Sequence, residues 1–385
     1  MGSKPQKHIG IVGAGIAGLT AAIMLQKQGY RISVFESSKN VSGVGAGIGL
    51  ASNAMKAFEY LGLASGIKEI SNPLKDFRVC DAKGDKLFAI DTNRIQENYR
   101  AGNYAVHRGD LHQYLINQID SEYIFSDKKL ISLKLHKEKV NLKFEDRSQT
   151  EVDYVIGADG VNSRVRQILL PEAKPRYAGY WCWRGVVKYT KKDPHKSMAL
   201  WGKNGRFGIT SIARDTVYWF ACINSPLDGE IADFGLKDLQ KQFQNYHPLV
   251  QELLSVSKAE EIISGPIMDV KPLFQFKFSR MLLIGDAAHA TTPNMGQGAC
   301  MALEDVAVFQ DELQQHDFKK ACFNFQLRRL DRTKYITVNS RRAGKIAQLD
   351  NSLLIFLRNN LFRILPEKLT QLPVKRLYEE DFMKI

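Results

Sequence analysis

Three glycines in the sequence have the spacing of a phosphate-binding turn. Gly13, Gly15 and Gly18 follow the short apolar run at 8–12 and open the helix-like stretch at 16–28. In such a turn the first glycine permits a tight bend, the second lets the backbone approach a pyrophosphate, and the third allows close packing of helix on strand. The helix dipole then favours the negative charge of the phosphates. We therefore predict a dinucleotide-binding unit here, with Ala17 among its contacts.

A carboxylate stands where such a unit needs one. Glu36 ends the next predicted strand, at 30–35. A carboxylate in this place accepts hydrogen bonds from ribose hydroxyls. The strand–helix–strand pattern supports dinucleotide binding, but the motif alone does not distinguish NAD from FAD.

A second glycine-aspartate segment follows the buried strand predicted at 154–156. Asp159 and Gly160 lie in this turn, with Ser163 and Arg166 shortly after it. Asp159 can cap the turn and direct polar groups toward a phosphate or ribose. It can also be a plain Asp-Gly turn residue, and the segment alone leaves both interpretations open.

A third segment follows the strand predicted at 281–284. Its aspartate is placed to bind a polyol hydroxyl, and its Pro/Gly loop opens the helix predicted at 299–313, whose first N–H groups face an anion. His289 is more typical of a buried, hydrogen-bonded structural histidine than of a catalytic base. The predicted cofactor contacts in this segment are Gly285, Asp286, Pro293, Gly296, Gln297 and Gly298.

The order of these segments predicts an α/β fold. Strands of the nucleotide-binding type occur in three separated places, and alternating, aromatic-rich strands are inserted between the second and third. We expect a Rossmann-type FAD-binding domain, an inserted, mainly antiparallel substrate domain and C-terminal helices broken by Pro366 and Pro373. A further helix is predicted at 110–119, with Asp110 as its N-cap. The predicted boundaries are 1–72, 101–174 and 275–330 for the FAD-binding domain, 73–100 and 175–274 for the substrate domain, and 331–385 for the helical segment.

The composition narrows the class of partner. A net charge of +13 suits an anionic ligand, a membrane surface or an ordinary solvated surface, and the basic residues are densest from 319 to 376. Without a nucleic-acid-binding signature, we expect no nucleic acid partner. No apolar run is long enough to span a membrane, although peripheral membrane contact stays open. Five cysteines without a CxxC pair indicate free thiols in a cytoplasmic protein and no metal site: Cys80, Cys182, Cys222, Cys300 and Cys322.

Together and in this order, the three segments resemble the signatures of the class A flavoprotein monooxygenases, the group that is similar to para-hydroxybenzoate hydroxylase. His107 to Leu111 resembles the R-x-x-L segment of that family. The resemblance implies that Arg108 and Gly49 contact FAD, and that Asp159 and Gly160 serve both FAD and a transient NADH or NADPH. No second Rossmann fingerprint is present, as expected for this family.

A closer resemblance is to bacterial urate hydroxylases and to enzymes like salicylate hydroxylase and zeaxanthin epoxidase. It rests on the segments 177–185 and 291–298. In the urate enzymes an Arg and, twelve positions later, a Tyr lie at the substrate. Arg206 and Tyr218 have that spacing, on adjacent predicted strands, and are the predicted substrate residues. A surface arginine and a core tyrosine are the alternative.

The resemblance implies a reaction. Tightly bound FAD, reduced by NADPH or NADH, would react with O₂ to a flavin C4a-hydroperoxide and insert one oxygen atom into a small aromatic or heteroaromatic substrate. Oxidation, epoxidation or inactivation of a larger polyketide, tetracycline-like or isoprenoid substrate is one alternative. A non-catalytic flavin-binding interaction protein is another. The sequence leaves open the substrate, the choice of nicotinamide, the catalytic base and whether the protein is a monomer or a homodimer.

Overall fold

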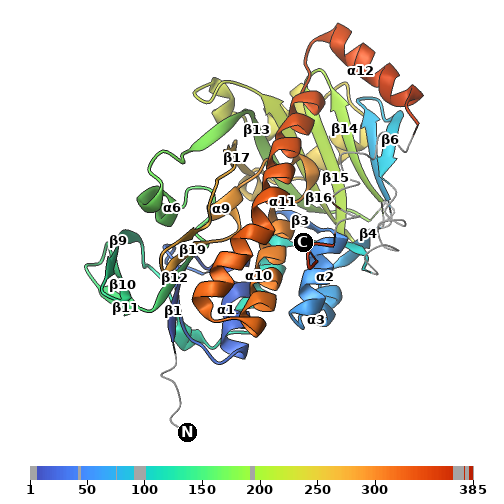
Figure 1. The fold of residues 1–385 in the computed structure, drawn as a ribbon. Coiled ribbons are helices and arrows are strands. Elements are labelled where there is room, and N and C mark those ends of the chain that lie inside the picture. Colours follow the sequence, from blue (N-terminus) through green and yellow to red (C-terminus); the bar gives the residue numbers. More distant parts are fainter. Residues whose placement is uncertain are drawn as a thin grey trace.

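The computed structural model describes residues 7–41, 45–74, 76–90, 101–190, 196–366, 377 and 381–384. Predictions that fall on 91–100, 191–195 or 367–376, among them the break at Pro373, lie outside the described residues. Two large sheets lie side by side, with a group of helices between and beside them (Figure 1). This mixed α/β architecture confirms the predicted fold class.

The first large sheet carries the nucleotide-binding pattern. Its strand order is β18-β19-β12-β1-β2-β8, and every pair is parallel except β18 with β19. Three strands from distant parts of the chain, β19, β12 and β1, are therefore neighbours, and their carboxyl ends meet at one edge. The strands are β1 (His8–Val12), β2 (Arg31–Phe35), β8 (Ile124–Phe125), β12 (Tyr154–Gly157), β18 (Lys277–Phe278) and β19 (Met281–Leu283).

Helices cover this sheet and bury its apolar side chains. Central strands read as almost continuous apolar runs because both of their faces are covered. Helices α1 and α10 pack against each other and contribute fully buried side chains such as Leu19, Leu25 and Val308 to one large core. The helices of this part are α1 (Ile16–Lys27), α2 (Ser52–Tyr60), α3 (Ala64–Glu69), α5 (Arg108–Ile116), α6 (Arg164–Leu169), α9 (Asp286–His289) and α10 (Gly298–Gln315).

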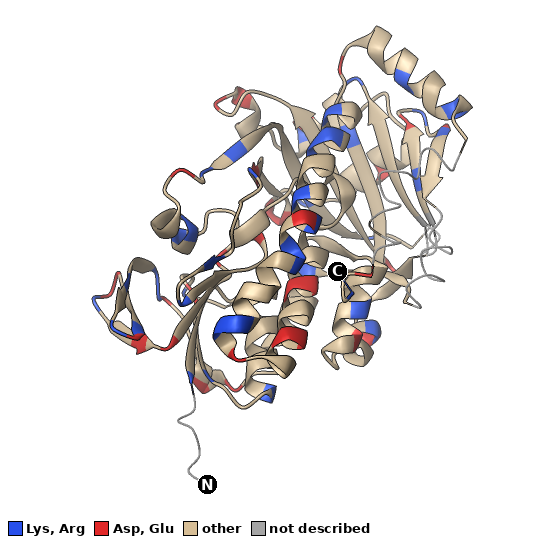
Figure 2. Ribbon diagram, viewed as in Figure 1, with Lys and Arg blue, Asp and Glu red and all other residues tan. Residues whose placement is uncertain are grey.

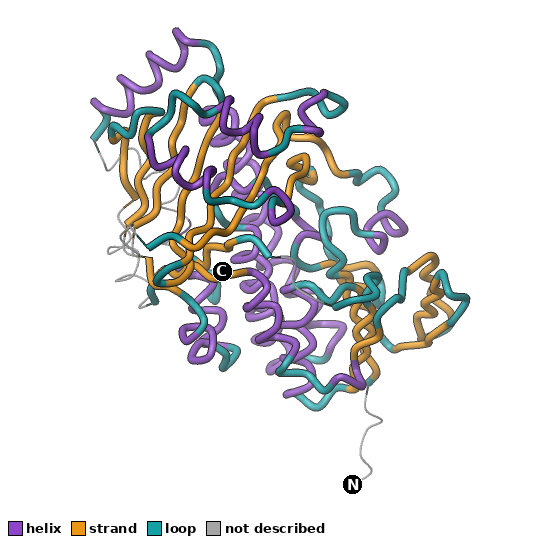
Figure 3. The backbone as a smooth tube through the Cα atoms, turned by 180° about the vertical axis from the view of Figure 1, so that it is seen from behind, coloured by secondary structure: helices purple, strands orange, loops and turns teal. Residues whose placement is uncertain are grey.

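The second large sheet, whose strands lie in the upper left of Figure 3, is mainly antiparallel. Its strand order is β17-β13-β16-β15-β14-β5-β6. Side chains alternate between its two faces. The back face is apolar and packs under α7 (Leu236–Gln242) and α8 (Pro248–Ser255). Its strands are β5 (Asp76–Asp81), β6 (Lys86–Ile90), β13 (Pro175–Lys188), β14 (Lys196–Gly202), β15 (Gly205–Ala213), β16 (Thr216–Asn224) and β17 (Ile263–Val270).

Two small sheets complete the strands. One consists of β3 (Gly47–Leu50), β7 (Asn103–His107) and β4 (Asn72–Leu74) and lies between the large sheets, while the other consists of β9 (Leu130–His136), β10 (Lys139–Phe144) and β11 (Gln149–Val152). The β3–β7–β4 sheet is not among the elements predicted from the sequence. Short 3-10 turns are η1 (Ser121–Tyr123), η2 (Glu230–Asp233), η3 (Ala259–Glu261) and η4 (Pro293–Met295).

Two long C-terminal helices follow. Helix α11 (Phe318–Ala347) runs from the helices of the first sheet toward the second, and α12 (Ser352–Ile364) lies at the far edge of the second sheet (Figure 1). The predicted break at Pro366 is confirmed, because α12 ends just before it. The boundary predicted between 330 and 331 falls inside α11, which continues through it. No helix within the described ranges has the length and apolarity needed to cross a bilayer.

The start of α5 differs from the prediction. Asp110 is not an N-cap: α5 begins at Arg108 with His107 as N-cap, so Asp110 lies in the first turn, where its charge still favours the helix dipole.

Basic residues spread over the molecule (Figure 2), yet the basic stretch after 319 is not simply a solvated face. Arg329 and Arg332 are buried.

Candidate active site

The glycine turn after β1 is shaped by close contacts. A Cβ atom at Gly18 would lie 1.9 Å from the Gly13 carbonyl oxygen, and one at Gly13 would lie 2.5 Å from the Ala158 carbonyl oxygen. Gly13 also has φ of 103°. At Gly15, by contrast, a Cβ would meet no atom of the described residues within 4 Å. Two glycines are thus needed for packing, while the middle one faces open space, as a phosphate-binding position does.

Glu36 closes this turn from the side. Its carboxylate accepts hydrogen bonds from the backbone N–H groups of Ala14 (2.8 Å) and Ser38 (2.9 Å). Burial alone would raise the pKa of Glu36, but these hydrogen bonds lower it. Glu36 is therefore a carboxylate at neutral pH, fixed at the end of β2 beside the turn.

The Asp159 segment follows β12, the neighbour of β1. The Asp159 carboxylate accepts hydrogen bonds from the Ser163 hydroxyl (2.5 Å) and from the N–H groups of Arg164 (2.7 Å) and Val165 (3.1 Å). Burial nevertheless raises its pKa. The Asp159 carboxylate thus holds the first turn of α6, whose N-cap is Ser163. Gly160, with φ of 77° and no described atom within 4 Å of a Cβ, leaves backbone accessible next to it.

Arg166 connects this segment to the next one and was not predicted as a site residue. It is fully buried, and its guanidinium donates to the carbonyl oxygens of Asp286 (3.3 Å), Ala287 (3.0 Å) and Ala173 (2.9 Å). Arg166 therefore holds α9 against α6. An arginine in the first turn after an Asp-Gly turn is the only sequence signal for it.

Asp286 follows β19, so the third segment lies at the same edge. Gly285 has φ of 57°, and a Cβ there would lie 2.9 Å from that of Ala17, which brings this turn against α1. Desolvation by the surrounding protein raises the pKa of Asp286, although His289, Arg108 and Arg166 act to lower it. Its side chain is still exposed. A carboxylate enclosed on several sides but accessible on one is suited to bind a ligand hydroxyl.

The loop between α9 and α10 provides further accessible backbone. Pro293 and Gly296 are exposed, and Gly298 begins α10, where a Cβ would lie 3.9 Å from Asp286 Oδ1. Gln297 instead points inward: its Oε1 accepts from Asn53 Nδ2 (2.9 Å), while its Nε2 is buried without a partner among the described residues. We therefore expect its backbone to face a cofactor.

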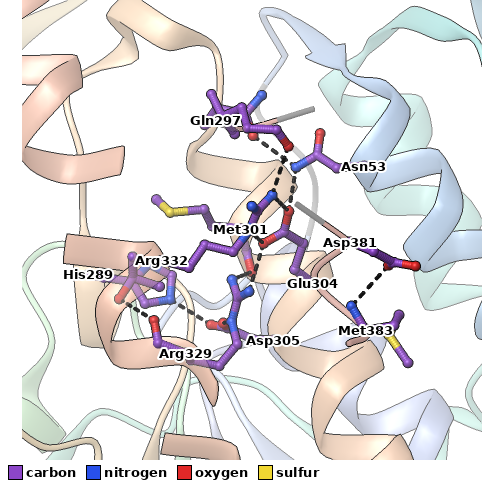
Figure 4. Close-up of polar contacts among 12 residues, drawn as sticks. Asn53, His289, Gln297, Met301, Glu304, Asp305, Arg329, Arg332, Asp381 and Met383 are labelled. Carbon is purple, nitrogen blue, oxygen red and sulfur yellow. Dashed lines mark hydrogen bonds and ion pairs between the residues drawn. The ribbon is translucent and has the colours of Figure 1, made fainter. Parts of the chain in front are cut away.

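Behind this loop lies a buried ionic network (Figure 4). The Glu304 carboxylate forms ion pairs with the guanidinium groups of Arg332 (2.6 Å) and Arg329 (2.7 Å). It also accepts a hydrogen bond from the Asn53 side-chain amide at 2.6 Å. Burial alone would raise the pKa of Glu304. The positive charges of the two arginines outweigh this effect and lower the pKa to about 2. The network therefore ties α10 to α11 and, through Asn53 and Gln297, to the loop before α10.

His289 belongs to the same network. Its Nε2 lies 2.6 Å from Asp305 Oδ2, and Asp305 also accepts from the Gly285 N–H (2.8 Å) and from Arg329 Nε (2.7 Å). His289 is buried. These contacts are those of a structural histidine that fixes the Gly285 turn.

The remaining predicted cofactor residues line the same edge. Arg108 is exposed at the start of α5 and close enough to Asp286 to act on its pKa. Gly49 lies in β3, where a Cβ would meet no described atom within 4 Å. The segments of all three motifs thus converge with α5 and β3 around one accessible region.

The front face of the second sheet lies opposite. Tyr218 on this face packs against β3, because a Cβ at Gly47 would lie 2.4 Å from its ring. On the neighbouring strand β13, Arg184 lies two residues from the residue that pairs with Tyr218. It is next to the Tyr218 hydroxyl and acts to lower the pKa of this group, which burial raises. Both side chains are partly exposed, and no carboxylate of the described residues forms an ion pair with Arg184. Arg184 was not predicted as a site residue.

Arg206 lies on the same face, but apart from Tyr218. It pairs in register with Cys222, four residues beyond Tyr218 on β16, which separates the two by roughly 13 Å along the strand. Its Nε donates to Gln348 Oε1 at 2.6 Å, and its guanidinium stacks on the Tyr180 ring at 5.2 Å. The predicted pair is therefore on adjacent strands, as expected, but its members are not in contact.

Comparison with known proteins identifies the family. The family described as "FAD binding domain" matches residues 6–316. The chain belongs to this family. It is 30% identical over 358 residues to the aurachin C monooxygenase/isomerase of Stigmatella aurantiaca, with 92% of this chain and 93% of that protein covered. It is 31% identical over 363 residues to the 2-heptyl-3-hydroxy-4(1H)-quinolone synthase of Pseudomonas aeruginosa, with 92% and 94% covered.

A solved structure has the same fold as this chain. Klebsiella pneumoniae HpxO complexed with FAD and uric acid superposes with a TM-score of 0.88 at 24% identity, with 97% of each chain covered. These relatives place the chain among the class A flavoprotein monooxygenases, so it is an FAD-dependent monooxygenase. The residues fit the cofactor: Gly15, Gly49, Gly160 and Gly296 leave open space where a bound nucleotide needs it, and Asp286 is accessible between them.

Proposed function

We propose that the protein hydroxylates a small heteroaromatic ring that carries an ionisable oxygen, with NADH or NADPH as electron donor. The balanced reaction is NAD(P)H + H⁺ + O₂ + RH → NAD(P)⁺ + ROH + H₂O. Bound FAD supplies electron transfer and oxygen activation. The observation that carries the proposal is the contact of Tyr218 with β3, since it joins the substrate-facing sheet to the strand of Gly49.

The chain itself has to bind and orient the substrate. We infer that Arg184, which lacks a carboxylate partner among the described residues, pairs with a substrate oxyanion, and that Tyr218 donates a hydrogen bond to it. Arg206 is proposed to contribute indirectly, because its guanidinium stacks on the Tyr180 ring. Both large sheets and β3 enclose the substrate, which limits access of water. The Pseudomonas aeruginosa relative is a 2-heptyl-3-hydroxy-4(1H)-quinolone synthase, and a hydroxylated quinolone belongs to this substrate class.

We propose the remaining cofactor roles as predicted from the sequence. Gly13, Gly15, Ala17, Gly18 and Glu36 would hold the adenosine end of FAD, and Arg108, Asp159, Gly160 and Asp286 its middle part. Pro293 and the 296–298 backbone would face the ring. We also propose the predicted domain boundaries, except the one between 330 and 331, which falls inside α11. A cytoplasmic location, supported by five free cysteines, and a monomer or homodimer are proposed as well.

The test uses the purified holoenzyme with panels of hydroxyquinolones, hydroxypyridines and phenols. We expect NADPH or NADH consumption to be stimulated by one heteroaromatic class, with a product heavier by one oxygen atom. Stimulation without an oxygenated product, or by none of the rings, would contradict the proposed substrate class. Asp286→Ala serves as control, since it is expected to lower FAD content.

A further inference from the structure

Helix α12 exposes an apolar face to solvent. Six large apolar residues of this helix are exposed, with relative exposure from 47% at Leu354 to 81% at Ile364. At 3.6 residues per turn they fall within about 160° of the helix circumference. Helices of water-soluble domains normally turn such a face inward. The six residues, which we call the α12 face, are Leu353, Leu354, Phe356, Leu357, Leu361 and Ile364.

The orientation of α12 is fixed by its other side. Arg358 is buried, donates to the carbonyl oxygens of Ile346 (3.0 Å) and Ala347 (3.3 Å) and stacks on Trp201 at 5.2 Å. Phe362 packs against Phe88 with ring centroids 5.0 Å apart. Because these contacts hold the inner side against the end of α11 and the sheet edge, the α12 face cannot rotate inward.

Exposed basic side chains precede this face along the chain. The helix contains no acidic residue, and only arginines are coloured as charged along it (Figure 2). Two acidic side chains beside it, Asp81 and Asp85, lie 2.7 and 3.7 Å from Arg363. Arg342 and Lys345 are exposed on the last turns of α11. Apolar side chains flanked by basic ones, on a chain of net charge +13, are complementary to an anionic membrane surface.

The position of the helix favours a membrane over a protein partner. Helix α12 lies at the periphery of the molecule, where a flat surface can approach it (Figure 1). Just before it, Gln348 and Asp350 line an open pocket of about 540 Å³ between the start of β13 and α11. Gln348 is the residue that holds Arg206. The pocket therefore lies between the base of α12 and the substrate-facing sheet.

We propose that the α12 face docks the protein on an anionic phospholipid bilayer, lying in its interface without crossing it. The apolar side chains of the α12 face enter the boundary between headgroups and acyl chains, and the exposed Arg342 and Lys345 contact the lipid phosphates. Docking places the mouth of the pocket close to the bilayer. A substrate of the proposed heteroaromatic class that is dissolved in the membrane then reaches the pocket without crossing bulk water.

The experiment is flotation of the FAD-loaded full chain with vesicles of phosphatidylcholine, alone or with phosphatidylglycerol. The test variant is Leu353→Gln/Phe356→Gln/Leu361→Gln. The matched control, Leu135→Gln/Phe274→Gln/Leu327→Gln, changes the same residue types at exposed positions elsewhere. We expect binding to anionic vesicles, weakened by salt, to fall at least about tenfold in the test variant only. FAD content and melting temperature should stay unchanged in both, because every changed side chain is exposed.

Three outcomes would overturn the proposal. The first is that the unchanged protein does not bind anionic vesicles, and the second is that the test variant binds as tightly or that the control loses as much. The third is sedimentation showing a dimer that only the test variant dissociates, without vesicle binding. The α12 face would then join two copies of the chain. None of these outcomes depends on the substrate, so the proposed reaction is tested separately.

Discussion

The two sides of the candidate active site are built from different material. On the nucleotide side, glycines at the ends of β1, β12 and β19 make the surface, and side chains such as Arg166 and Asp305 support it from behind. On the facing wall, the side chains of Arg184 and Tyr218 themselves make the surface. The nucleotide side thus depends on backbone at glycine positions, while the wall depends on the identity of its side chains.

The largest effect is expected where a glycine is needed for packing. Gly18→Val puts side-chain atoms where even a Cβ would lie 1.9 Å from a backbone oxygen, so we expect destabilisation of more than about 3 kcal/mol and loss of the flavoprotein. Gly15→Ala sharpens the comparison, because open space surrounds Gly15. This variant should keep its apo melting temperature and lose FAD. Flavin absorbance and thermal unfolding measure both, and equal destabilisation by the two substitutions would contradict the distinction.

The buried network behind the loop comes next. Glu304→Gln leaves Arg329 and Arg332 buried with less compensating charge, and we expect a loss of about 3–5 kcal/mol in the free energy of unfolding. Replacing both partners, as in Glu304→Met/Arg332→Met, should recover part of that loss. Urea unfolding of the holoenzyme measures it. A single variant as stable as the unchanged protein would show that the loop does not depend on the network.

The same carboxylate predicts an acid limit. The pKa of Glu304 is lowered from its ordinary value to about 2 in the folded protein. Its contribution to stability is therefore fully present above the unfolded pKa near 4.5 and is lost as pH falls toward 2. Stability should decline over that range, and less steeply in Glu304→Gln. Denaturant midpoints measured across acidic pH test this, and parallel curves for the two proteins would assign the decline to other groups.

On the substrate wall we expect a kinetic effect rather than a structural one. Arg184→Met should lower kcat/KM by about 10- to 100-fold, or roughly 1.4–2.8 kcal/mol, because it removes the charge that orients the substrate oxyanion. FAD content should not change. Arg184→Lys, which keeps the charge but not the planar fork, should restore activity partly. Loss of FAD in Arg184→Met would move this residue from the wall to the cofactor side.

The same contrast explains what the sequence could predict. Gly13, Gly18 and Gly285 were predictable because their place in the turn demands the absence of a side chain. The partner of Tyr218 was not, because it depends on strand register. The spacing between Arg206 and Tyr218 is compatible with contact, yet Arg206 pairs with Cys222, and the cation beside Tyr218 comes from β13. Arg166 and the Glu304 network join segments too distant for any local pattern to connect.

Arg206 gives the smallest expected effect on kcat/KM and the most discriminating one. Because its guanidinium contacts Gln348 and Tyr180, Arg206→Met should cost about 1.5–3 kcal/mol of stability through the lost charged hydrogen bond. It should lower kcat/KM by less than about tenfold, and less than Arg184→Met does. Thermal unfolding and steady-state kinetics of both variants on one substrate decide between them. If Arg206→Met lowers kcat/KM more than Arg184→Met, the spacing in the sequence identifies the substrate residue better than the contacts of the wall do.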